Sequence, residues 1–195
     1  TGLTTLNLPN SLIRIESKAF YGCTALSGNL IIPRNVQKIG DEAFGSCTGV
    51  TEFTVDVDNT VYWSDKSGAL YASSGEFIAW PAGREQDIYV VFRGGVTGAV
   101  TKINEGAFRS CKLQTCYIPD SVTFIERNAF ADAKNLKKLY FFGNCPTISD
   151  DAFPDWSRII DVYHQESTTG WTVDTWPSWH FALHSWMAQE KIPYS

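Results

Sequence analysis

Five copies of one short unit run through this chain and restrict what it can fold into. Each copy is an isoleucine, three variable residues and the pair Ala-Phe, and the copies begin at Ile15, Ile39, Ile103, Ile125 and Ile148. The Phe residues of successive copies are 24, 64, 22 and 23 positions apart. Periods of about 20 to 29 residues are typical of leucine-rich solenoids, in which each repeat forms one coil.

A second unit of each repeat has the alternation of a β-strand. Its first, fourth and sixth positions are apolar, as in Leu3-Leu6-Leu8, Val50-Phe53-Val55, Leu113-Cys116-Ile118 and Leu136-Leu139-Phe141; Leu26-Leu30-Ile32 has one residue more. Pro9, Pro33 and Pro119 follow three of these strands, and proline cannot donate to a sheet. We therefore expect each repeat to be a short strand, a proline-marked turn, and a helical or 3₁₀ turn that carries Ala-Phe. Stacked repeats of this kind form an α/β solenoid, here a right-handed leucine-rich-repeat superhelix with parallel strands.

The composition excludes several classes of protein. The 195 residues are 44% hydrophobic and 14% aromatic, with a formal net charge of -5, which is unlike a disordered chain. Apolar runs are too short to cross a membrane, so we expect no membrane insertion by this segment. Basic residues form no cluster, so nucleic acid and anionic lipid are not expected partners. The chain begins at Thr1, which we interpret as a trimmed chain whose export signal is not in this sequence.

The repeat resembles the BspA-like class of leucine-rich repeats. The resemblance is carried by Ile32-Pro33, Val36, Ile39-Gly40, Ala43-Phe44, Cys47 and Val50, and again by residues 118–122 with Ala129-Phe130. The 64-residue interval between Phe44 and Phe108 is similar to the hairpin-bearing variant repeat of that family. The similarity is carried by Asn59, Tyr62, Gly68, Leu70-Tyr71 and residues 80–83. Residues 140–146 and 169–171 are similar to its closing repeat.

The resemblance implies a protein that is secreted or held at the outer cell surface, with adhesion or ligand binding as its role and no named ligand. We expect a solenoid over residues 1–170, with the variant repeat at about 56–95. Beyond Gly170 the repeat is lost and Trp residues are closely spaced, so we expect a Trp-rich cap over 171–195. The segment from Val91 to Val96 lacks the Ile-Pro of the other repeats, so we expect the strand at 88–93 to be offset or bulged. Apolar residues at helical spacing between Ser178 and Gln189 predict an amphipathic helix in the cap.

All five cysteines are in register with apolar positions of the repeat. Cys23, Cys47 and Cys111 lie three residues after the repeat Phe, Cys116 takes a strand position, and Cys145 takes a position held elsewhere by Leu or Val. We therefore favour buried free thiols. A Cys23–Cys47 disulfide is within reach across stacked coils but disfavoured, because equivalent side chains point in parallel. Zinc is disfavoured because no Cys-x-x-Cys pair is present.

Acidic residues recur before Ala-Phe, at Asp41-Glu42, Glu105, Glu126 and Asp150-Asp151. They could serve acid–base catalysis or bind calcium, but we favour caps that accept backbone N–H bonds, because a catalytic pair would not be repeated. His180 and His184 have the spacing of a metal pair, yet Phe181 stands where a zinc protease needs Glu, so we favour solvated histidines. The segment Gly45–Gly49 has the glycines of a nucleophile elbow around Cys47 rather than Ser.

The remaining candidate is the outer surface of the strands, which we expect to be concave. Residues between the apolar strand positions form two rows: Asn7, Thr54, Tyr117 and Tyr140, and Thr5, Glu52, Thr115 and Lys138. Extended concave faces are the usual binding surfaces of solenoids. The alternative for the tyrosines, held equally, is that they pack against each other on the sheet. Trp63 and Trp80 could stack on sugar or protein, but we favour a role in the core of the hairpin.

These patterns predict a non-enzymatic binding or adhesion module. Its expected partner is a protein, such as a host matrix or other surface protein, or a glycan. The predicted binding residues are Glu52, Thr54, Thr115, Tyr117, Lys138 and Tyr140. We expect no catalytic residue, metal or cofactor. Two alternatives stay open: a structural spacer within a longer surface protein, and an accessory domain of a glycan-acting enzyme.

Overall fold

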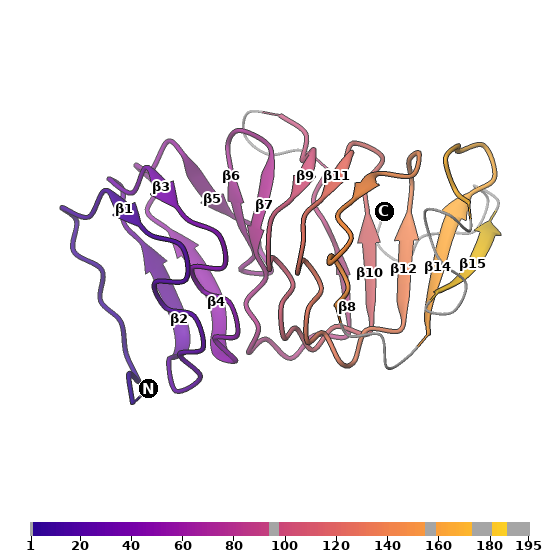
Figure 1. Ribbon diagram of the computed structural model, residues 1–195. Helices are drawn as coiled ribbons and strands as arrows, with labels where there is room; N and C mark the ends of the chain where they lie inside the picture. Colours follow the sequence, from indigo (N-terminus) through magenta and orange to yellow (C-terminus); the bar gives the residue numbers. More distant parts are fainter. Residues whose placement is uncertain (1, 94–97, 155–158, 173–180, 187–195) are drawn as a thin grey trace.

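The computed structural model describes residues 2–93, 98–154, 159–172 and 181–186, which form a row of coils side by side (Figure 1). The longer strands lie on one side of the coils: β2 (Ser27–Ile32), β4 (Gly49–Val55), β8 (Ile88–Val90), β10 (Thr115–Ile118), β12 (Lys138–Phe141), β14 (Ile160–Gln165) and β15 (Phe181–Trp186). Two-residue strands form the other side: β1 (Arg14–Ile15), β3 (Lys38–Ile39), β9 (Lys102–Ile103), β11 (Phe124–Ile125) and β13 (Thr147–Ile148). The variant repeat adds β5 (Tyr62–Ser64), β6 (Leu70–Ala72) and β7 (Glu76–Ala79).

The sheet on the long-strand side is interrupted. One part is the parallel pair β2-β4, and the other is a parallel sheet in the order β8-β10-β12-β14-β15. Between them, the segment after β7 lies on β4: Gly83 donates its N–H to the Val50 carbonyl at 2.7 Å. A Cβ at Gly83 would lie 2.6 Å from the Thr48 carbonyl oxygen, so this close approach requires glycine. The interruption is therefore built into the backbone.

The turn that carries Ala-Phe is a series of β-turns, so the predicted helical or 3₁₀ turns are wrong. The residue before Ala has positive φ in four repeats, and so has the second residue after Phe: Lys18, Glu42, Gly106 and Asn128, then Gly22, Ser46, Ser110 and Asp132. Two left-handed residues so close together prevent a right-handed helix. The turn N–H groups instead donate partly to the next coil, as Phe20 does to the Ala43 carbonyl at 2.8 Å. The described residues contain no helix.

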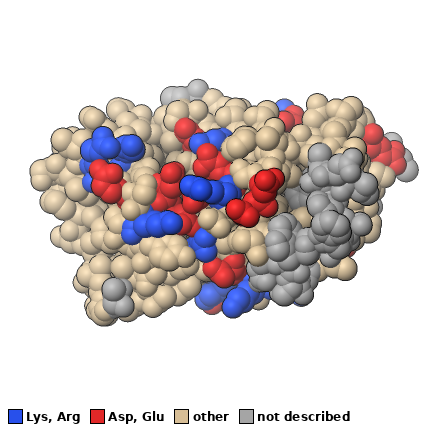
Figure 2. Space-filling model, in the orientation of Figure 1, with Lys and Arg blue, Asp and Glu red and all other residues tan. Residues whose placement is uncertain are grey.

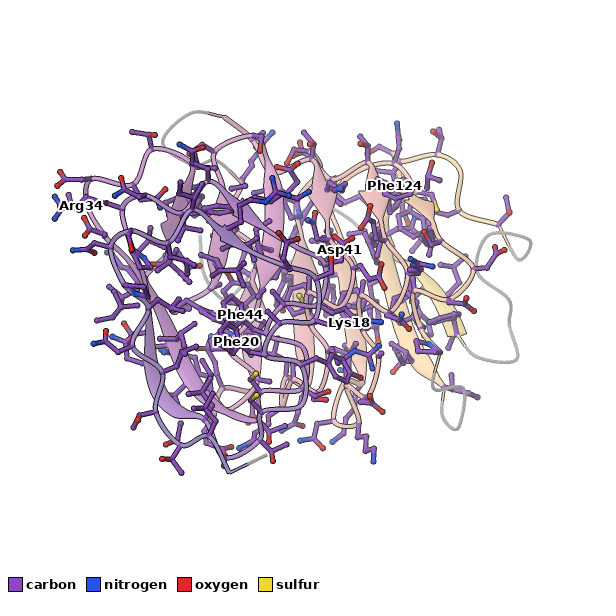
Figure 3. All side chains as sticks on the ribbon, turned by 60° about the vertical axis from the view of Figure 1, so that its left-hand side comes forward. Lys18, Phe20, Arg34, Asp41, Phe44 and Phe124 are labelled. Atoms are coloured by element: carbon purple, nitrogen blue, oxygen red, sulfur yellow. The ribbon has the colours of Figure 1, made fainter. Side chains whose placement is uncertain are left out.

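The Phe residues of the repeat stack in columns through the core. Phe108, Phe130 and Phe153 have centroid separations of 4.9 and 4.8 Å and interplanar angles of 3° and 1°. Phe20 and Phe44, seen in successive coils in Figure 3, are 5.7 Å apart at 3°. The repeat therefore builds a core in which each coil supports the next.

Strand β6 divides this core into two clusters. Leu70 and Ala72 belong to the cluster formed by the first coils, whereas Tyr71, between them in sequence, belongs to the cluster formed by the later coils. Successive side chains of a strand point to opposite faces, so β6 contributes to both. The hairpin is fastened to the earlier coil by Asn59, whose Nδ2 donates to the carbonyls of Pro33 and Val36 at 2.8 and 3.1 Å.

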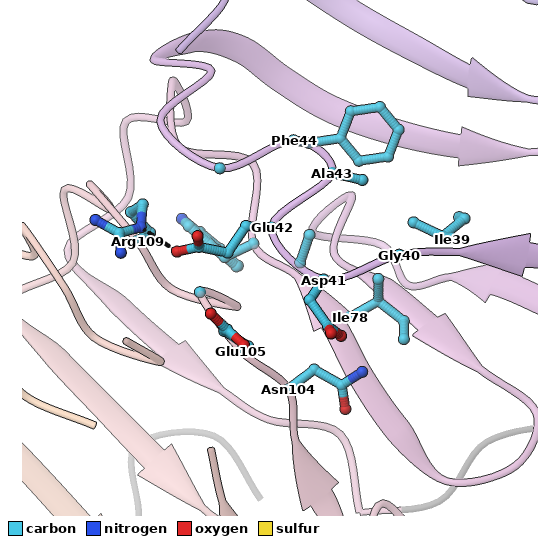
Figure 4. Close-up of a pocket in the computed structure, with 14 residues that line it drawn as sticks. Ile39, Gly40, Asp41, Glu42, Ala43, Phe44, Ile78, Asn104, Glu105 and Arg109 are labelled. Atoms are coloured by element: carbon cyan, nitrogen blue, oxygen red, sulfur yellow. Dashed lines mark hydrogen bonds and ion pairs between the residues drawn. The ribbon is translucent and has the colours of Figure 1, made fainter. Parts of the chain in front are cut away.

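On the edge that carries the turns, the coils before and after the variant repeat meet directly. Glu42 accepts a hydrogen bond from Nε of Arg109 at 2.7 Å (Figure 4), and the hydroxyls of Ser46 and Ser110 are 3.1 Å apart. Pairs more than sixty residues apart are thus neighbours. The hairpin separates the two sheets on the long-strand side, called the strand side below. The edge that carries the turns is continuous across the variant repeat.

Three further local predictions differ from the structure, and one is confirmed. Residues 2–8 include no strand, so the predicted strand at Leu3–Leu8 is wrong. Strand β8 pairs with β10 in regular register, so the expected offset or bulge at 88–93 is wrong. Residues 181–186 of the predicted Ser178–Gln189 helix form strand β15; the rest of that segment lies outside the described residues. The extra residue between Leu26 and Leu30 is confirmed as a register shift after Gly28.

Candidate functional site

The predicted binding residues lie on the outer side of the strands, in two separate groups. Thr115 and Tyr117 on β10 pair in register with Lys138 and Tyr140 on β12. Glu52 and Thr54 lie on β4, which belongs to the other sheet. Thr5 and Asn7, members of the same rows, lie in the segment without a strand. The structure thus brings four of the six residues together, and whether they bind a partner stays a prediction.

The tyrosines form an aromatic ladder that is longer than the sequence predicted. Tyr117, Tyr140, Tyr163 and His184 stack in register across β10, β12, β14 and β15, with centroid separations of 4.7, 4.5 and 4.8 Å. The two predicted tyrosines do pack against each other, and Tyr117 is only 8% exposed. Stacked rings cover each other's faces, which leaves little ring face for a ligand.

His184 is paired with a carboxylate at the end of the ladder. Its Nε2 lies 3.1 Å from Oδ1 of Asp161, and both side chains are partly exposed. His180 lies outside the described residues, so the spacing of the predicted pair is not described. Among the described residues, no three His, Cys, Asp or Glu side chains gather in a way that could hold a metal ion.

Three of the acidic residues before Ala-Phe, Glu42, Glu105 and Glu126, make ion pairs between coils. Glu42, with 2% of its side chain exposed, contacts Lys18 at 3.2 Å and Arg109 at 2.7 Å, and Glu105 contacts Arg127 at 2.9 Å. Glu126 accepts the backbone N–H of Glu105 from the preceding coil rather than one from its own turn. Figure 2 shows acidic and basic side chains interleaved across one face. These three glutamates thus link coils, and the predicted capping of their own turns is wrong for them. For Asp41, Asp150 and Asp151, capping stays a prediction.

The cysteines are largely confirmed as buried thiols. None of the five forms a disulfide; Cys23, Cys47, Cys111 and Cys116 are buried and Cys145 is half-buried. Burial raises the pKa of Cys47 to about 11 and that of Cys116 well above its ordinary value. A thiol that stays protonated is a poor nucleophile, so these groups lack the properties of a catalytic cysteine.

A groove opens where the strand-side sheet is interrupted. Its volume is about 890 Å³. Residues 63–67 of the hairpin line one part of it, and residues 86–90 together with Phe92 line the other. Trp63 stacks on Tyr71 at 4.2 Å and 7° and contacts the edge of Phe92, whose exposure is 52%. Trp63 is therefore part of the groove as well as of the hairpin packing, whereas Trp80 is 3% exposed and packs on Tyr89, as favoured from the sequence.

Asp65 holds the inner end of this groove in place. Its Oδ1 accepts the N–H groups of Ser67 and Ala69 at 2.8 and 3.0 Å, and its Oδ2 accepts the hydroxyls of Tyr71 and Tyr89 at 3.1 and 2.5 Å. Burial is the main reason that the pKa of each tyrosine is well above its ordinary value, and the Asp65 charge acts in the same direction. The cluster ties the hairpin to β8 and gives the groove a rigid base.

Sequence reasoning missed this groove because its two sides, residues 63–67 and residues 86–90 with Phe92, come from separate segments of the chain. Two sequence features lie near the groove. One is Trp63, a large aromatic residue in the variant repeat, and the other is the absence of the Ile-Pro pair after residue 91. Neither feature shows that the sheet is interrupted at this position.

The described part of the chain holds no apolar helix of membrane-spanning length.

Comparison with known proteins gives one family and several similar folds. The family model described as "BspA type Leucine rich repeat region" matches residues 1–67 and 96–175 in six copies. The structure of a leucine rich cell surface protein from Faecalibacterium prausnitzii A2-165 is similar with a TM-score of 0.66 and 26% identity, over 94% of this chain and 53% of that chain. This chain therefore spans about half the length of that protein.

Two further structures are less similar. A leucine-rich repeat protein from Eubacterium ventriosum ATCC 27560 has a TM-score of 0.44 and 15% identity, over 73% of this chain and 47% of that chain. The pneumococcal vaccine antigen PcpA has a TM-score of 0.48 and 19% identity, over 93% and 63%. Among curated protein sequences, none matches this chain.

Proposed function

Because the chain belongs to the BspA-type leucine-rich repeat family, we propose that it is a non-enzymatic binding module of a surface protein. Surface location is supported by the similar structure, which is described as a cell surface protein. Solenoids expose a continuous row of strands, and this row is their usual binding surface. The proposed module therefore uses its strand side to bind a protein or a glycan.

The observation that carries this proposal is the groove in the strand side. Its volume of about 890 Å³ lies within the range of ligand sites, about 300 to 1,000 Å³. Aromatic side chains at the rim and a fixed polar cluster at the base give it the mixed character of a recognition site. The aromatic ladder begins beside it, since Val90 of the groove pairs in register with Tyr117.

A binding screen tests the proposal. Purified chain would be presented to arrays of host matrix proteins and of glycans, and hits would be measured by surface plasmon resonance. Two double variants, Trp63→Ala with Phe92→Ala and Tyr117→Ala with Tyr140→Ala, would show which part of the strand side is used. Each variant's melting temperature would be measured to establish folding. Binding that either double variant removes supports the proposal, and failure to bind any probe contradicts it and favours a structural spacer.

A further inference from the structure

The edge of β8 that faces away from β10 carries backbone groups that can still pair. The ladder with β10 uses the Asp87 carbonyl, which accepts from Thr115 N–H at 2.9 Å, and the Val91 N–H, which donates to the Tyr117 carbonyl at 2.9 Å. Backbone groups of a strand alternate in direction, so those of Ile88 and Val90 point to the other side. Within the described residues, no hydrogen bond is recorded for the N–H of Ile88 or for either polar group of Val90.

The groove follows this edge. A groove on the face of a sheet would be lined by alternate residues of a strand, because neighbouring side chains point to opposite faces. Here Ile88, Tyr89 and Val90 all line it, as do the consecutive residues Gln86 and Asp87. The other wall is likewise a consecutive segment, 63–67. The groove therefore runs beside the β8 backbone, where a further strand of the sheet would lie.

The charges along the groove favour a cationic partner. Asp65 and Asp87 both line it, and among the described residues neither forms an ion pair. Both oxygens of Asp65 already accept hydrogen bonds within the hairpin cluster, whereas Asp87 accepts one side-chain bond, from Nε2 of Gln114 at 2.8 Å, and so is the carboxylate that a basic group can reach. Asp87 is exposed, and Lys66 is the only cation of the lining. A carboxylate without a cation partner attracts a basic group on a ligand. Trp63 and Phe92 beside these carboxylates offer apolar contact area.

We propose that the groove binds an extended peptide segment of a partner protein, which adds a strand to the edge of β8. The backbone of the peptide pairs with Val90 and with Ile88, one of its apolar side chains contacts Trp63 and Phe92, and a neighbouring Lys or Arg lies near Asp87. Strand addition of this kind draws affinity from main-chain hydrogen bonds and specificity from alternate side chains. The proposal rests on the binding role proposed above and names the class of ligand.

Gln86 occupies part of this edge in the unbound protein. Its side-chain Nε2 donates to the Ile88 carbonyl at 2.6 Å, and its Oε1 accepts from Nε of Arg84 at 3.1 Å. Side chains that cover an exposed strand edge protect it from unwanted pairing. A peptide that donates a bond to the Ile88 carbonyl must first displace this amide. Gln86 therefore lowers the affinity of the groove for every peptide, and weakly binding sequences are excluded.

The test uses a phage library of random linear peptides, selected against the intact chain. Selected sequences are expected to combine a basic with an aliphatic or aromatic residue. One such peptide would then be synthesised with single backbone N-methyl groups at each position in turn. Strand pairing predicts that every second N-methyl group weakens binding about tenfold or more, since one hydrogen bond is lost, while the groups between them have little effect.

Variants of the protein supply the second measurement. Val90→Pro removes an N–H that points away from β10, so the ladder is kept and the peptide affinity is expected to fall about tenfold. Val90→Ala keeps the N–H and serves as the matched control, while Gln86→Ala is expected to strengthen binding. Circular dichroism would verify that each variant is folded.

Several results would overturn the inference. These are a library that yields no binder, an N-methyl series without alternation, or Val90→Pro binding like Val90→Ala. If a glycan or a folded protein binds and is lost only in the Tyr117→Ala, Tyr140→Ala variant, the strand-addition inference is wrong while the binding role stands. If no probe of any class binds, the binding role itself fails.

Discussion

Replacing Arg109 by Met tests the ion pair that joins the coils on either side of the variant repeat. The Arg109 side chain is 10% exposed and that of Glu42 is 2% exposed, so the substitution leaves a buried carboxylate with a single remaining cation partner. That partner, Lys18, is 60% exposed and lies 3.2 Å away. Removing one member of a buried pair costs about 3 to 5 kcal/mol. Because Lys18 partly compensates, we expect a loss of about 3 kcal/mol in the free energy of unfolding.

Other contacts of Arg109 add little to this estimate. Asp132, its second partner, is 52% exposed, and an exposed ion pair contributes about 0 to 1 kcal/mol. The guanidinium also lies 5.5 Å from the Tyr21 ring centroid, a cation–π contact of about 0.5 to 1 kcal/mol at a surface site. The predicted loss is therefore dominated by the uncompensated Glu42 carboxylate.

Urea denaturation followed by circular dichroism measures the loss, and a double-mutant cycle isolates the pair. Glu42→Gln together with Arg109→Met removes both charges and is expected to recover a large part of the stability that Arg109→Met loses. Arg14→Met is the matched control, because the Arg14–Glu16 pair is exposed at both ends and should change stability by less than about 0.5 kcal/mol. The reasoning is refuted if Arg109→Met lies within about 1 kcal/mol of the wild type, or if the double variant is no more stable than the single one.

Three further predictions concern the core. Phe130→Ala removes the middle ring of a stacked column and should cost about 3 to 5 kcal/mol in urea denaturation; a loss below about 1 kcal/mol would contradict a stacked core. In native protein, a thiol reagent should label Cys145 first and the four buried cysteines slowly, as read by mass spectrometry; prompt labelling of several would contradict their burial. Because burial raises the pKa of Cys47 from 9.0 to about 11, the unfolded chain loses that proton first and stability should fall between these pH values. Cys116 and the buried tyrosines contribute to the same fall, so Cys47→Ala should make the slope smaller; equal slopes would argue against the shift.

The coils could be predicted because the residues that define the repeat are core residues. Ile39, Ala43-Phe44 and Cys47 are buried in the structure, at positions that the repeat marks as apolar. Core positions have a strong sequence signature, since only apolar side chains satisfy them. The register of the strands follows from the same positions, as the pairing of Cys116 with Leu139 illustrates.

The shape of the turns could not be predicted in this way. Lys18, Glu42 and Asn128 adopt left-handed backbone conformations at equivalent positions, and Lys and Glu are ordinary helix formers by propensity. The N–H groups of Lys18 and Asn128 donate to carbonyls of the next coil, at Asp41 and Asp151, and a single repeat does not contain these bonds. Local propensity is a weak prior where tertiary contacts act against it.

The last strand shows a related ambiguity. Phe181 is buried and Leu183 packs against the core, which fits the period of a strand. Over six residues this alternation is hard to separate from helical spacing. Pairing with the edge of β14 decides between them, since an uncovered sheet edge favours a further strand. The groove escaped prediction for a similar reason, because a missing strand leaves no residue pattern in the sequence.

The division of the core by β6 has a mechanical consequence. Leu70 and Tyr71 are neighbours in the chain but pack into different halves of the molecule. A tensile load along the row of coils is therefore carried between the halves by this strand and by contacts such as Glu42 with Arg109 and Gly83 with Val50. If such a module is stretched between two anchoring points, we expect the joint between the halves to separate before either cluster does. The groove lies beside that joint. We therefore expect tension to change the affinity for a peptide bound there before either half unfolds.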